Sequence, residues 1–396
     1  MKIFSNDFVV NLPKNKKPTK GGPAKFSRLF QKEIINRGHK WVGLVIVDSG
    51  HKFKSNLVYK NGKKTYWSLL IPNGYVSQKF SKAKKYQDPS KSGRDIINEV
   101  KNILNVEQPD LVFLNGFWCL NWAILIAANE LNIPVITLYA GVWSIELDLY
   151  ADFYSEAGLK IFKKMEIDSA TLSTCNIFLN KTTKDYFTKN IYKIPKSKIE
   201  IIPLPCEKLN DDLKNKIKKQ SNEFKNIGIV ARWDRIKNHK AFYDFACESK
   251  TQGKKWNFFA VTTIPETNKF KEFKDGYRKL IKVLAPMDQK KLKLFYQKMD
   301  FMLLPSFFDV SPHVVLEAAL ENVPTFISKN VGHMDFFKDN NLQNFIVDFS
   351  NSKKAIVQIE SIKNIKYPLT FVNLLKERHN PEGIFDSYEK LFNEII

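Results

Sequence analysis

The chain contains 396 residues, more than one compact core usually holds, so two domains of about 150 to 200 residues each are expected. Hydrophobic residues make up 43% and aromatic residues 13% of the sequence, which excludes a disordered or low-complexity protein. The formal net charge is +22, and residues 1–100 hold 21 basic and 6 acidic residues, a surplus of +15; this leaves open an anionic partner or a lysine-rich composition with solvated side chains.

The first half of the chain alternates short β-branched or aromatic runs with helical patterns, which is typical of a parallel sheet with crossover helices. After the first strand, Gly21-Gly22-Pro23 opens an amphipathic helix from Ala24 to Arg37, which Gly38 ends. The sequence thus predicts an α/β fold that begins with a βαβ unit. The predicted strands are Lys2 to Phe4, Trp41 to Val47, Leu111 to Leu114, Val135 to Tyr139, Ile177 to Leu179 and Ile199 to Leu204.

Two segments depart from this rhythm. Residues 57–71 contain two β-rich runs around Asn61-Gly62, which predicts a β-hairpin. The basic, turn-rich segment from Ser77 to Gly93 is expected to be a mobile loop.

One apolar run, from Leu111 to Ala128, approaches the length of a transmembrane helix. Because it contains Asn115, Gly116 and Asn121, it is better interpreted as a buried strand followed directly by a helix. The first residues also lack the pattern of a secretory signal, so we expect a cytoplasmic protein.

Four cysteines lie far apart in the sequence and form no CxxC pair, which indicates neither a zinc site nor a disulfide framework. These cysteines are Cys119, Cys175, Cys206 and Cys247.

A highly charged stretch from residue 208 to 225 follows the first alternating series and predicts the linker between two domains. The expected division is a first domain at 1–207, a second at 226–375, and a C-terminal helix at 376–396. The second alternating series comprises Asn226 to Val230 (strand), His239 to Thr251 (helix), Trp256 to Thr262 (strand), Asp288 to Lys298 (helix), Phe301 to Pro305 (strand), Pro312 to Leu320 (helix) and Thr325 to Ile327 (strand).

The stretch from Asp309 to Glu317 is the first candidate site. It follows a buried strand, Ser311 is a suitable N-cap, and Pro312 suits the first helical position, so the amides of His313 and Val314 could hold an anion. Asp309 and Glu317 could then accept hydrogen bonds from sugar hydroxyls. The alternative is a turn residue and a solvated helical glutamate.

Arg232 and Lys237 are the second candidate pair. They follow a hydrophobic strand in the loop before a helix, from which arginine can contact a diphosphate in bidentate fashion and lysine supplies a point charge. Two solvated cations are the alternative.

At these residues the sequence resembles the family-4 retaining glycosyltransferases of the GT-B fold. Asp309 and Glu317, with seven residues between them, resemble the paired-acid motif, although the family usually has Glu at the first position. Arg232 and Lys237 match the spacing of the basic pair that binds the donor diphosphate. The opening glycines Gly21 and Gly22 and the C-terminal helix fit the same family, while Tyr139 stands where many members carry a histidine.

The resemblance implies two doubly wound, Rossmann-like domains facing across a cleft. It also implies a retaining transfer of a hexose from a nucleotide-diphosphate sugar to a hydroxyl, with no metal and no cofactor. It implies that Arg232 and Lys237 stabilise the leaving diphosphate, that Asp309 binds the sugar and that Glu317 binds ribose. Gly21, Gly22, Ser311, Pro312, His313 and Val314 are the other residues expected on the donor side.

The acceptor is left open between alternatives. Lys14, Lys16, Lys17 and Lys20, in the loop after the first strand, favour an anionic acceptor, and Tyr139 is a further acceptor-side candidate. One hypothesis is a glycolipid or polysaccharide of the cell envelope, reached by a protein peripheral to the inner face of the membrane. Another is modified DNA, as for some phage enzymes, and a third is a non-catalytic nucleotide-sugar-binding protein. The oligomeric state is not predicted.

Overall fold

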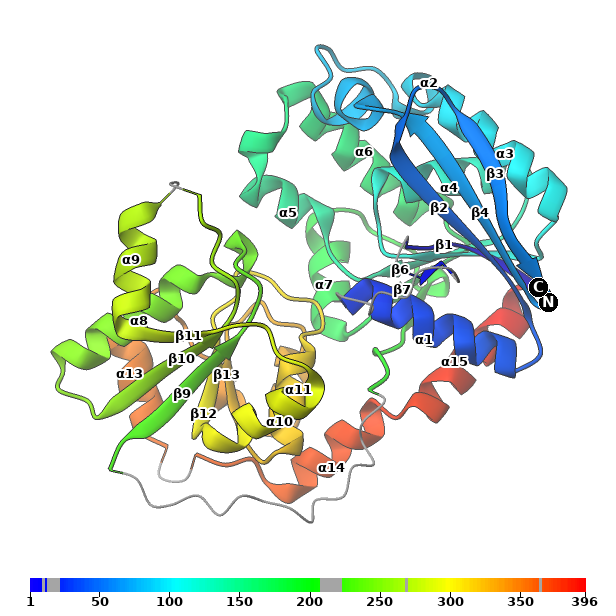
Figure 1. Ribbon diagram of the computed structural model, residues 1–396. Helices are drawn as coiled ribbons and strands as arrows, with labels where there is room; N and C mark the ends of the chain where they lie inside the picture. Colours follow the sequence, from blue (N-terminus) through cyan, green and yellow to red (C-terminus); the bar gives the residue numbers. More distant parts are fainter. Residues whose placement is uncertain (9–10, 13–21, 207–222, 268–269, 363–364) are drawn as a thin grey trace. The chain divides into compact units, whose positions relative to one another are not determined.

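The computed structural model describes residues 1–396 except 9–10, 13–21, 207–222, 268–269 and 363–364 (Figure 1). Its contacts divide the chain into two compact units. Unit 1 comprises Met1–Pro205 together with Glu382–Ile396, and unit 2 comprises Cys206–Pro381.

Unit 1 is built on an eight-stranded sheet in the order β3-β4-β2-β1-β5-β6-β7-β8. All neighbouring strands are parallel except β3 and β4, which form the predicted hairpin around Gly62, where φ is +55°. The parallel sheet with crossover helices is therefore confirmed. The strands are β1 (Lys2–Asn6), β2 (Lys40–Gly50), β3 (Lys54–Asn61), β4 (Lys64–Pro72), β5 (Leu111–Asn115), β6 (Val135–Tyr139), β7 (Cys175–Phe178) and β8 (Ile199–Ile201).

Helices cover the faces of this sheet (Figure 1). The predicted strand-then-helix interpretation of residues 111–128 is confirmed, because β5 is followed by α4, whose residues from Cys119 to Ala128 are all buried. The helices of unit 1 are α1 (Gly22–Asn36), α2 (Pro89–Ser92), α3 (Arg94–Glu107), α4 (Cys119–Glu130), α5 (Trp143–Leu149), α6 (Glu156–Leu172), α7 (Lys181–Asn190) and α15 (Pro381–Ile395).

The C-terminal helix α15 packs on unit 1 through aromatic side chains. The ring of Tyr388 meets that of Phe30 on α1 at 5.0 Å and that of Phe113 on β5 at 5.8 Å. An Arg37–Asp386 ion pair at 2.8 Å lies beside these rings. Apolar burial over two elements thus holds the returning helix in place.

The segment from Ser77 to Gly93 is not the loose loop that the sequence predicts. It contains a π-helical turn, η2 (Ser77–Ser81), whose Phe80 is fully buried. The turn packs on α6, where Ser155 donates from its backbone to Ser81 O at 2.9 Å and from its hydroxyl to Ala83 O at 2.8 Å. The segment is rich in lysine, so the sequence did not reveal that Phe80 would be buried and hold it in place.

Unit 2 contains a five-stranded, fully parallel sheet in the order β11-β10-β9-β12-β13. Its strands are β9 (Lys225–Val230), β10 (Trp256–Val261), β11 (Ile281–Leu284), β12 (Phe301–Leu304) and β13 (Thr325–Ile327). Its helices are α8 (His239–Thr251), α9 (Lys271–Leu280), α10 (Gln289–Lys298), α11 (His313–Leu320), α12 (Met334–Asp339), α13 (Ser352–Glu360) and α14 (Leu369–Arg378).

The predicted C-terminal helix at 376–396 is two helices. α14 ends at Arg378, and α15 begins at Pro381, where a proline suits the first turn. The chain passes from unit 2 back to unit 1 at this break. Most of the predicted linker at 208–225 lies outside the described residues, and Lys225 already belongs to β9.

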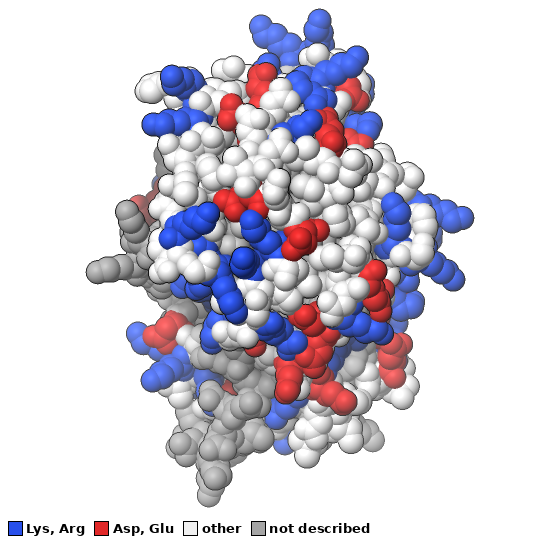
Figure 2. Space-filling view, turned by 90° about the vertical axis from the view of Figure 1, so that its right-hand side faces the viewer, with Lys and Arg blue, Asp and Glu red and all other residues white. Residues whose placement is uncertain are grey.

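Charge is mixed on the face that Figure 2 shows: Lys and Arg side chains are numerous, but Asp and Glu side chains lie among them. The surplus of positive charge therefore does not form one uninterrupted basic surface on that face. Within the described part of the chain, no helix has both the length and the apolar character needed to cross a membrane.

Candidate functional site

The candidate site of unit 2 lies where β9, β10 and β12 end. Because these strands are parallel, their carboxyl ends meet at one edge of the sheet. Two hydrogen bonds join the loop after β9 to the loop after β12: Phe307 N donates to Ile236 O at 2.9 Å, and Asn238 Nδ2 donates to Pro305 O at 3.1 Å. The side chains of the two loops are therefore held in fixed positions relative to one another.

Lys237 and Asp309, predicted separately from the sequence, form an ion pair across these loops. The distance from Lys237 Nζ to Asp309 Oδ2 is 2.5 Å, and the two side chains are only 18% and 13% exposed. The backbone of Asp309 is fixed as well, because Gly332 N donates to its carbonyl at 2.7 Å. Because water has little access to either side chain, this charge-assisted hydrogen bond holds both of them in one orientation.

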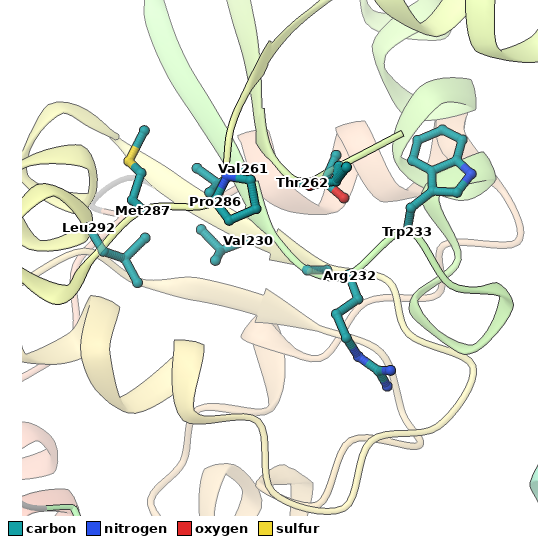
Figure 3. Close-up of a pocket in the computed structure, with 10 residues that line it drawn as sticks. Val230, Arg232, Trp233, Val261, Thr262, Pro286, Met287 and Leu292 are labelled. Carbon is teal, nitrogen blue, oxygen red and sulfur yellow. The ribbon is translucent and has the colours of Figure 1, made fainter. Parts of the chain in front are cut away.

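Arg232 lies at the same edge but is solvated. Its side chain is 78% exposed and only 3.4 Å from the Asp234 carboxylate. Figure 3 shows the guanidinium extending away from the apolar residues around Val230. Arg232 is thus an accessible cation in the loop that also carries Lys237 of the partly buried ion pair.

The helix α11 begins at His313, one residue later than predicted, and its N-cap is Pro312 rather than Ser311. Pro312 keeps an extended ψ of 109°, and no side chain caps the helix. The imidazole of His333 instead donates from Nε2 to Pro312 O at 3.3 Å. Burial lowers the pKa of His333 well below its ordinary value, so the ring is neutral. The N-terminal turn, with Pro312, His313 and Val314, remains a possible anion-binding group.

Glu317 is not a solvated helical glutamate. Its Oε1 accepts from Gln289 Nε2 at 3.2 Å, and its Oε2 accepts from the Tyr296 hydroxyl at 2.9 Å, both on α10. Burial and the Glu317 carboxylate raise the pKa of Tyr296, so this hydroxyl stays protonated as a donor. Neither partner was predicted, because α10 gave only a helical pattern in the sequence.

A cavity of about 350 Å³ opens beside these groups (Figure 3). Its wall is mostly apolar and comes from the ends of β9 and β10 and the start of α10. Leu292, which lines it, lies one turn after Gln289, the partner of Glu317. The lining residues are Val230, Ala231, Arg232, Trp233, Val261, Thr262, Thr263, Pro286, Met287 and Leu292.

Thr262 is the unexpected polar group of this wall. Its side chain is 3% exposed, and Oγ1 has no hydrogen-bond partner among the described residues. A buried hydroxyl without a partner costs free energy unless a ligand supplies one. Apolar walls with a small number of polar groups are typical of pockets that bind small molecules. Nothing in the sequence beyond the predicted end of a strand indicates this pocket.

Two of the residues predicted in unit 1 are described by the structure, the acceptor-side candidate Tyr139 and the donor-side candidate Gly22. Tyr139 is fully buried, with its ring stacked on Phe178 at 4.8 Å and against Phe187 at 4.9 Å, so it presents no surface to an acceptor. Gly22 begins α1, and no atom lies within 4 Å of where a Cβ would stand, so sterics do not require glycine there. Lys14, Lys16, Lys17, Lys20 and Gly21 lie outside the described residues.

Among the described residues, no group of three or more His, Cys, Asp or Glu side chains is arranged to hold a metal ion. The candidate site of unit 2 therefore consists of two cations, two carboxylates, a helix N-terminus and an apolar cavity, all at one edge of a parallel sheet.

Residues 210–380 match the model of the family glycosyl transferases group 1. No curated protein matches the sequence. The family match covers the part of the chain that carries the candidate site.

Solved structures share the fold over the full length at low sequence identity. A sucrose-phosphate synthase from Thermosynechococcus elongatus is 13% identical with a TM-score of 0.66, covering 100% of this chain and 99% of that one. A trehalose-6-phosphate structure from E. coli bound with UDP-2-fluoro glucose is 12% identical with a TM-score of 0.66, covering 100% of both chains. An α,α-trehalose-phosphate synthase (UDP-forming) from Burkholderia xenovorans in complex with glucose-6-phosphate is 11% identical with a TM-score of 0.65 and 99% coverage of both. The chain has the GT-B fold, and the family match supports a glycosyltransferase.

Proposed function

We propose that this protein transfers a hexosyl group from a nucleotide-diphosphate sugar to an acceptor hydroxyl, with retention of configuration and without a metal ion, as a family-4 glycosyltransferase. The observation that carries the proposal is the Lys237–Asp309 ion pair at 2.5 Å, next to the N-terminus of α11 and the cavity of about 350 Å³. This edge offers a chemically suitable group for each part of a nucleotide sugar: the nucleobase, the ribose, the diphosphate and the sugar.

In the proposed complex the nucleobase occupies the apolar cavity, with its polar edge on the Thr262 hydroxyl. The Glu317 carboxylate, oriented by Gln289 and Tyr296, accepts hydrogen bonds from the ribose hydroxyls. The diphosphate binds Arg232, Lys237 and the first turn of α11, where the helix dipole favours negative charge. Asp309 accepts from a hydroxyl of the sugar.

The reaction breaks the bond between the anomeric carbon and the diphosphate oxygen and forms a bond to the acceptor oxygen on the same face. The acceptor proton passes to the leaving phosphate oxygen, which removes the need for a separate protein base. Charge develops on the diphosphate as its bond breaks, so Arg232 and Lys237 stabilise the transition state more than the bound donor.

A cell-envelope glycolipid or polysaccharide is the proposed acceptor, with modified DNA as the competing candidate. The mixed charge on the face in Figure 2 does not separate the two candidates, because an anionic membrane surface and a DNA duplex both attract cations. The enzyme would work in the cytoplasm, at the inner face of the membrane.

The test is a turnover assay with UDP-, GDP-, ADP- and dTDP-glucose, in which release of the nucleoside diphosphate is followed with and without EDTA. We expect one donor to be turned over, EDTA to have no effect, and NMR of the product to show the donor's anomeric configuration. Release of the nucleoside diphosphate from none of the four donors, with or without added acceptors, argues for a non-catalytic binding protein.

A further inference from the structure

His239, the first residue of α8, is a buried polar side chain to which the proposed reaction gives no role. It is 4% exposed and lies two residues after Lys237. Its imidazole is bonded on both sides: Nε2 lies 2.9 Å from Arg232 O, and Nδ1 lies 2.9 Å from the Tyr277 hydroxyl of α9. The side chain thus connects α8, α9 and the loop after β9.

The two bonds fix the protonation of this ring. A carbonyl oxygen can only accept, so Nε2 carries the proton and donates to Arg232 O. Burial lowers the pKa of His239 to about 4, and Lys237 acts in the same direction, so the ring is neutral and Nδ1 accepts from Tyr277. A donor aimed at one backbone carbonyl is more than packing requires, because an apolar side chain packs without the cost of burying polar atoms.

The bond from His239 closes the loop that carries both cations of the candidate site. This loop runs from the end of β9 through the 3-10 turn η5 (Arg235–Lys237) to the start of α8. Its far end is anchored, because Asn238 Nδ2 donates to Pro305 O at 3.1 Å. His239 follows Asn238 directly, so its bond transmits this anchorage back to Arg232 at the near end of the loop.

Arg232 depends on this bond more than Lys237 does. The Lys237 side chain is held by Asp309 at 2.5 Å. The Arg232 side chain is 78% exposed and lies 3.4 Å from the Asp234 carboxylate. A long, solvated side chain keeps much of its rotamer freedom, so the position of its backbone decides which points the guanidinium can reach. A fixed Arg232 carbonyl limits that range before a donor binds.

The imidazole of His239 also supports one wall of the cavity. Trp233, which lines the cavity, stacks on the His239 ring at 4.7 Å with 27° between the planes. The Trp233 ring meets that of Tyr277 edge-on at 5.0 Å. Figure 3 shows the Trp233 indole and the Arg232 guanidinium pointing apart from neighbouring positions of the loop. His239 therefore holds Arg232 by its backbone and Trp233 by its ring.

We infer that His239 is a positioning residue for the transfer: through its bond to Arg232 O it sets where the Arg232 guanidinium meets the diphosphate of the donor. The inference rests on the proposed function, since it requires that Arg232 acts on a leaving diphosphate. The imidazole touches no reacting atom and acts through Arg232. A residue that only packs would instead weaken the protein by an amount that does not depend on the Arg232 side chain.

Two conservative substitutions separate the two bonds of the imidazole. The amide of glutamine can place an N–H where Nε2 stands, so His239→Gln keeps a donor for Arg232 O, whereas the shorter asparagine keeps only the acceptor for Tyr277. With the donor that the wild type turns over, His239→Asn is expected to lower kcat/KM roughly tenfold, mostly through kcat, and His239→Gln to stay within about threefold of the wild type. In the Arg232→Ala background, His239→Asn is expected to change kcat/KM by less than about twofold.

The matched control is His39→Asn, which replaces a buried imidazole of unit 1 that bonds the Met1 amino group and the Glu389 carboxylate, and which is expected to leave kcat/KM unchanged. Equal losses in His239→Asn and His239→Gln would overturn the inference, as would the same loss from His239→Asn with and without the Arg232 side chain.

Proton–nitrogen NMR of the imidazoles tests the bond without turnover. We expect the His239 ring to carry its proton on Nε2, and a proton on Nδ1 instead would overturn the inference even in an active enzyme. Turnover of no donor by the wild type would refute the proposed function and, with it, the role of His239 in the reaction. Turnover by the wild type with either of the two contrary results for the His239 variants would refute the role of His239 alone.

Discussion

At the scale of single residues, Lys237 and Asp309 depend on one another. Each side chain is largely buried and each charge is compensated by the other at 2.5 Å. Removing either partner leaves a poorly solvated charge, so substitutions here affect both folding and donor binding. Kinetic measurements on these variants therefore need a stability measurement beside them.

Lys237→Ala is predicted to lower kcat/KM by about 10²-fold, because it removes a cation that acts on the leaving diphosphate. Arg232→Ala is expected to have an effect of the same order on kcat/KM and little on stability, since its side chain is 78% exposed. The matched control is Lys240→Ala, which removes an exposed lysine paired with Asp244 on α8. Near-normal turnover by both site variants at saturating donor would contradict the assignment.

Thr262→Val separates a ligand-binding role from a structural one. Because the Thr262 hydroxyl is buried without a protein partner, its replacement by a methyl group is predicted to leave the free energy of unfolding unchanged or to raise it by up to about 1 kcal/mol. Donor affinity is predicted to fall roughly tenfold. Thr263→Val, at an exposed position of the same cavity, is the control in the titration of donor binding. Unchanged affinity in Thr262→Val would remove the hydroxyl from the site.

At the scale of elements, a glycine explains why the basic segment after Ser77 is ordered. A Cβ on Gly158 of α6 would stand 2.4 Å from Ser81 O and 2.9 Å from Phe80 O. Gly158→Ala is therefore predicted to destabilise the protein by about 1 to 3 kcal/mol in urea unfolding, because backbone atoms must move apart. Gly383→Ala in α15 meets no atom within 4 Å and is expected to stabilise by up to about 1 kcal/mol. Equal effects of the two substitutions would contradict the close packing of η2 on α6.

The N-terminus of α5 is predicted to weaken with rising pH. Burial raises the pKa of Glu166 from 4.5 to about 7, whereas the unfolded chain ionises near the lower value. The folded state thus binds more protons between these values, and its contribution to stability, complete below pH 4.5, is lost as pH rises to about 7, on the order of 3 kcal/mol. Urea unfolding from pH 5 to 8 should show the stability of the wild type falling relative to that of Glu166→Gln, since the buried histidines His239 and His333, whose pKa values burial lowers, titrate alike in both proteins and cancel in the difference.

Glu156→Gln is the control for that measurement. Glu156 lies on the same helix, and its hydrogen bond with Lys160 lowers its pKa, so its removal cannot flatten the decline. A profile of Glu166→Gln that runs parallel to the wild type would show that Glu166 does not cause the pH dependence.

Elements were predicted with the right bounds where the hydrophobic periodicity and a boundary residue, such as an N-cap or a proline, indicated the same position. The helix from His239 to Thr251 and the strand from Thr325 to Ile327 have the predicted bounds, since Asn238 caps the first and Pro324 precedes the second. α9 and β11 were missed because Leu280 passes directly into Ile281, without a glycine or proline between helix and strand.

The sequence predicted only part of the candidate site, because some of its residues belong to no local motif. Asp309, Glu317, Arg232 and Lys237 stand in short motifs after strands, so the sequence alone could single them out. Thr262, Gln289 and Tyr296 matter through contacts between segments far apart in the chain, which no local pattern contains. For Tyr139 the opposite holds. Its place after a strand made it a plausible site residue, but in the fold its ring packs against Phe178 and is buried.

At the scale of the whole molecule, the two units carry different kinds of chemistry. The described edge of unit 2 offers cations, a helix N-terminus and an apolar cavity, whereas the edge of unit 1 where β5 ends offers the exposed indole of Trp118. The net charge of +22 is a property of the whole chain and does not by itself locate a site.

The most direct test of the central claim is equilibrium binding of a donor panel to the purified chain. UDP-, GDP-, ADP- and dTDP-glucose are titrated by calorimetry against the wild type, Lys237→Ala and the control Lys240→Ala. The proposed function predicts that one donor binds the wild type and the control alike, and binds Lys237→Ala at least tenfold more weakly, a difference of about 1.4 kcal/mol. Binding of no donor, or equal binding to all three proteins, would contradict it.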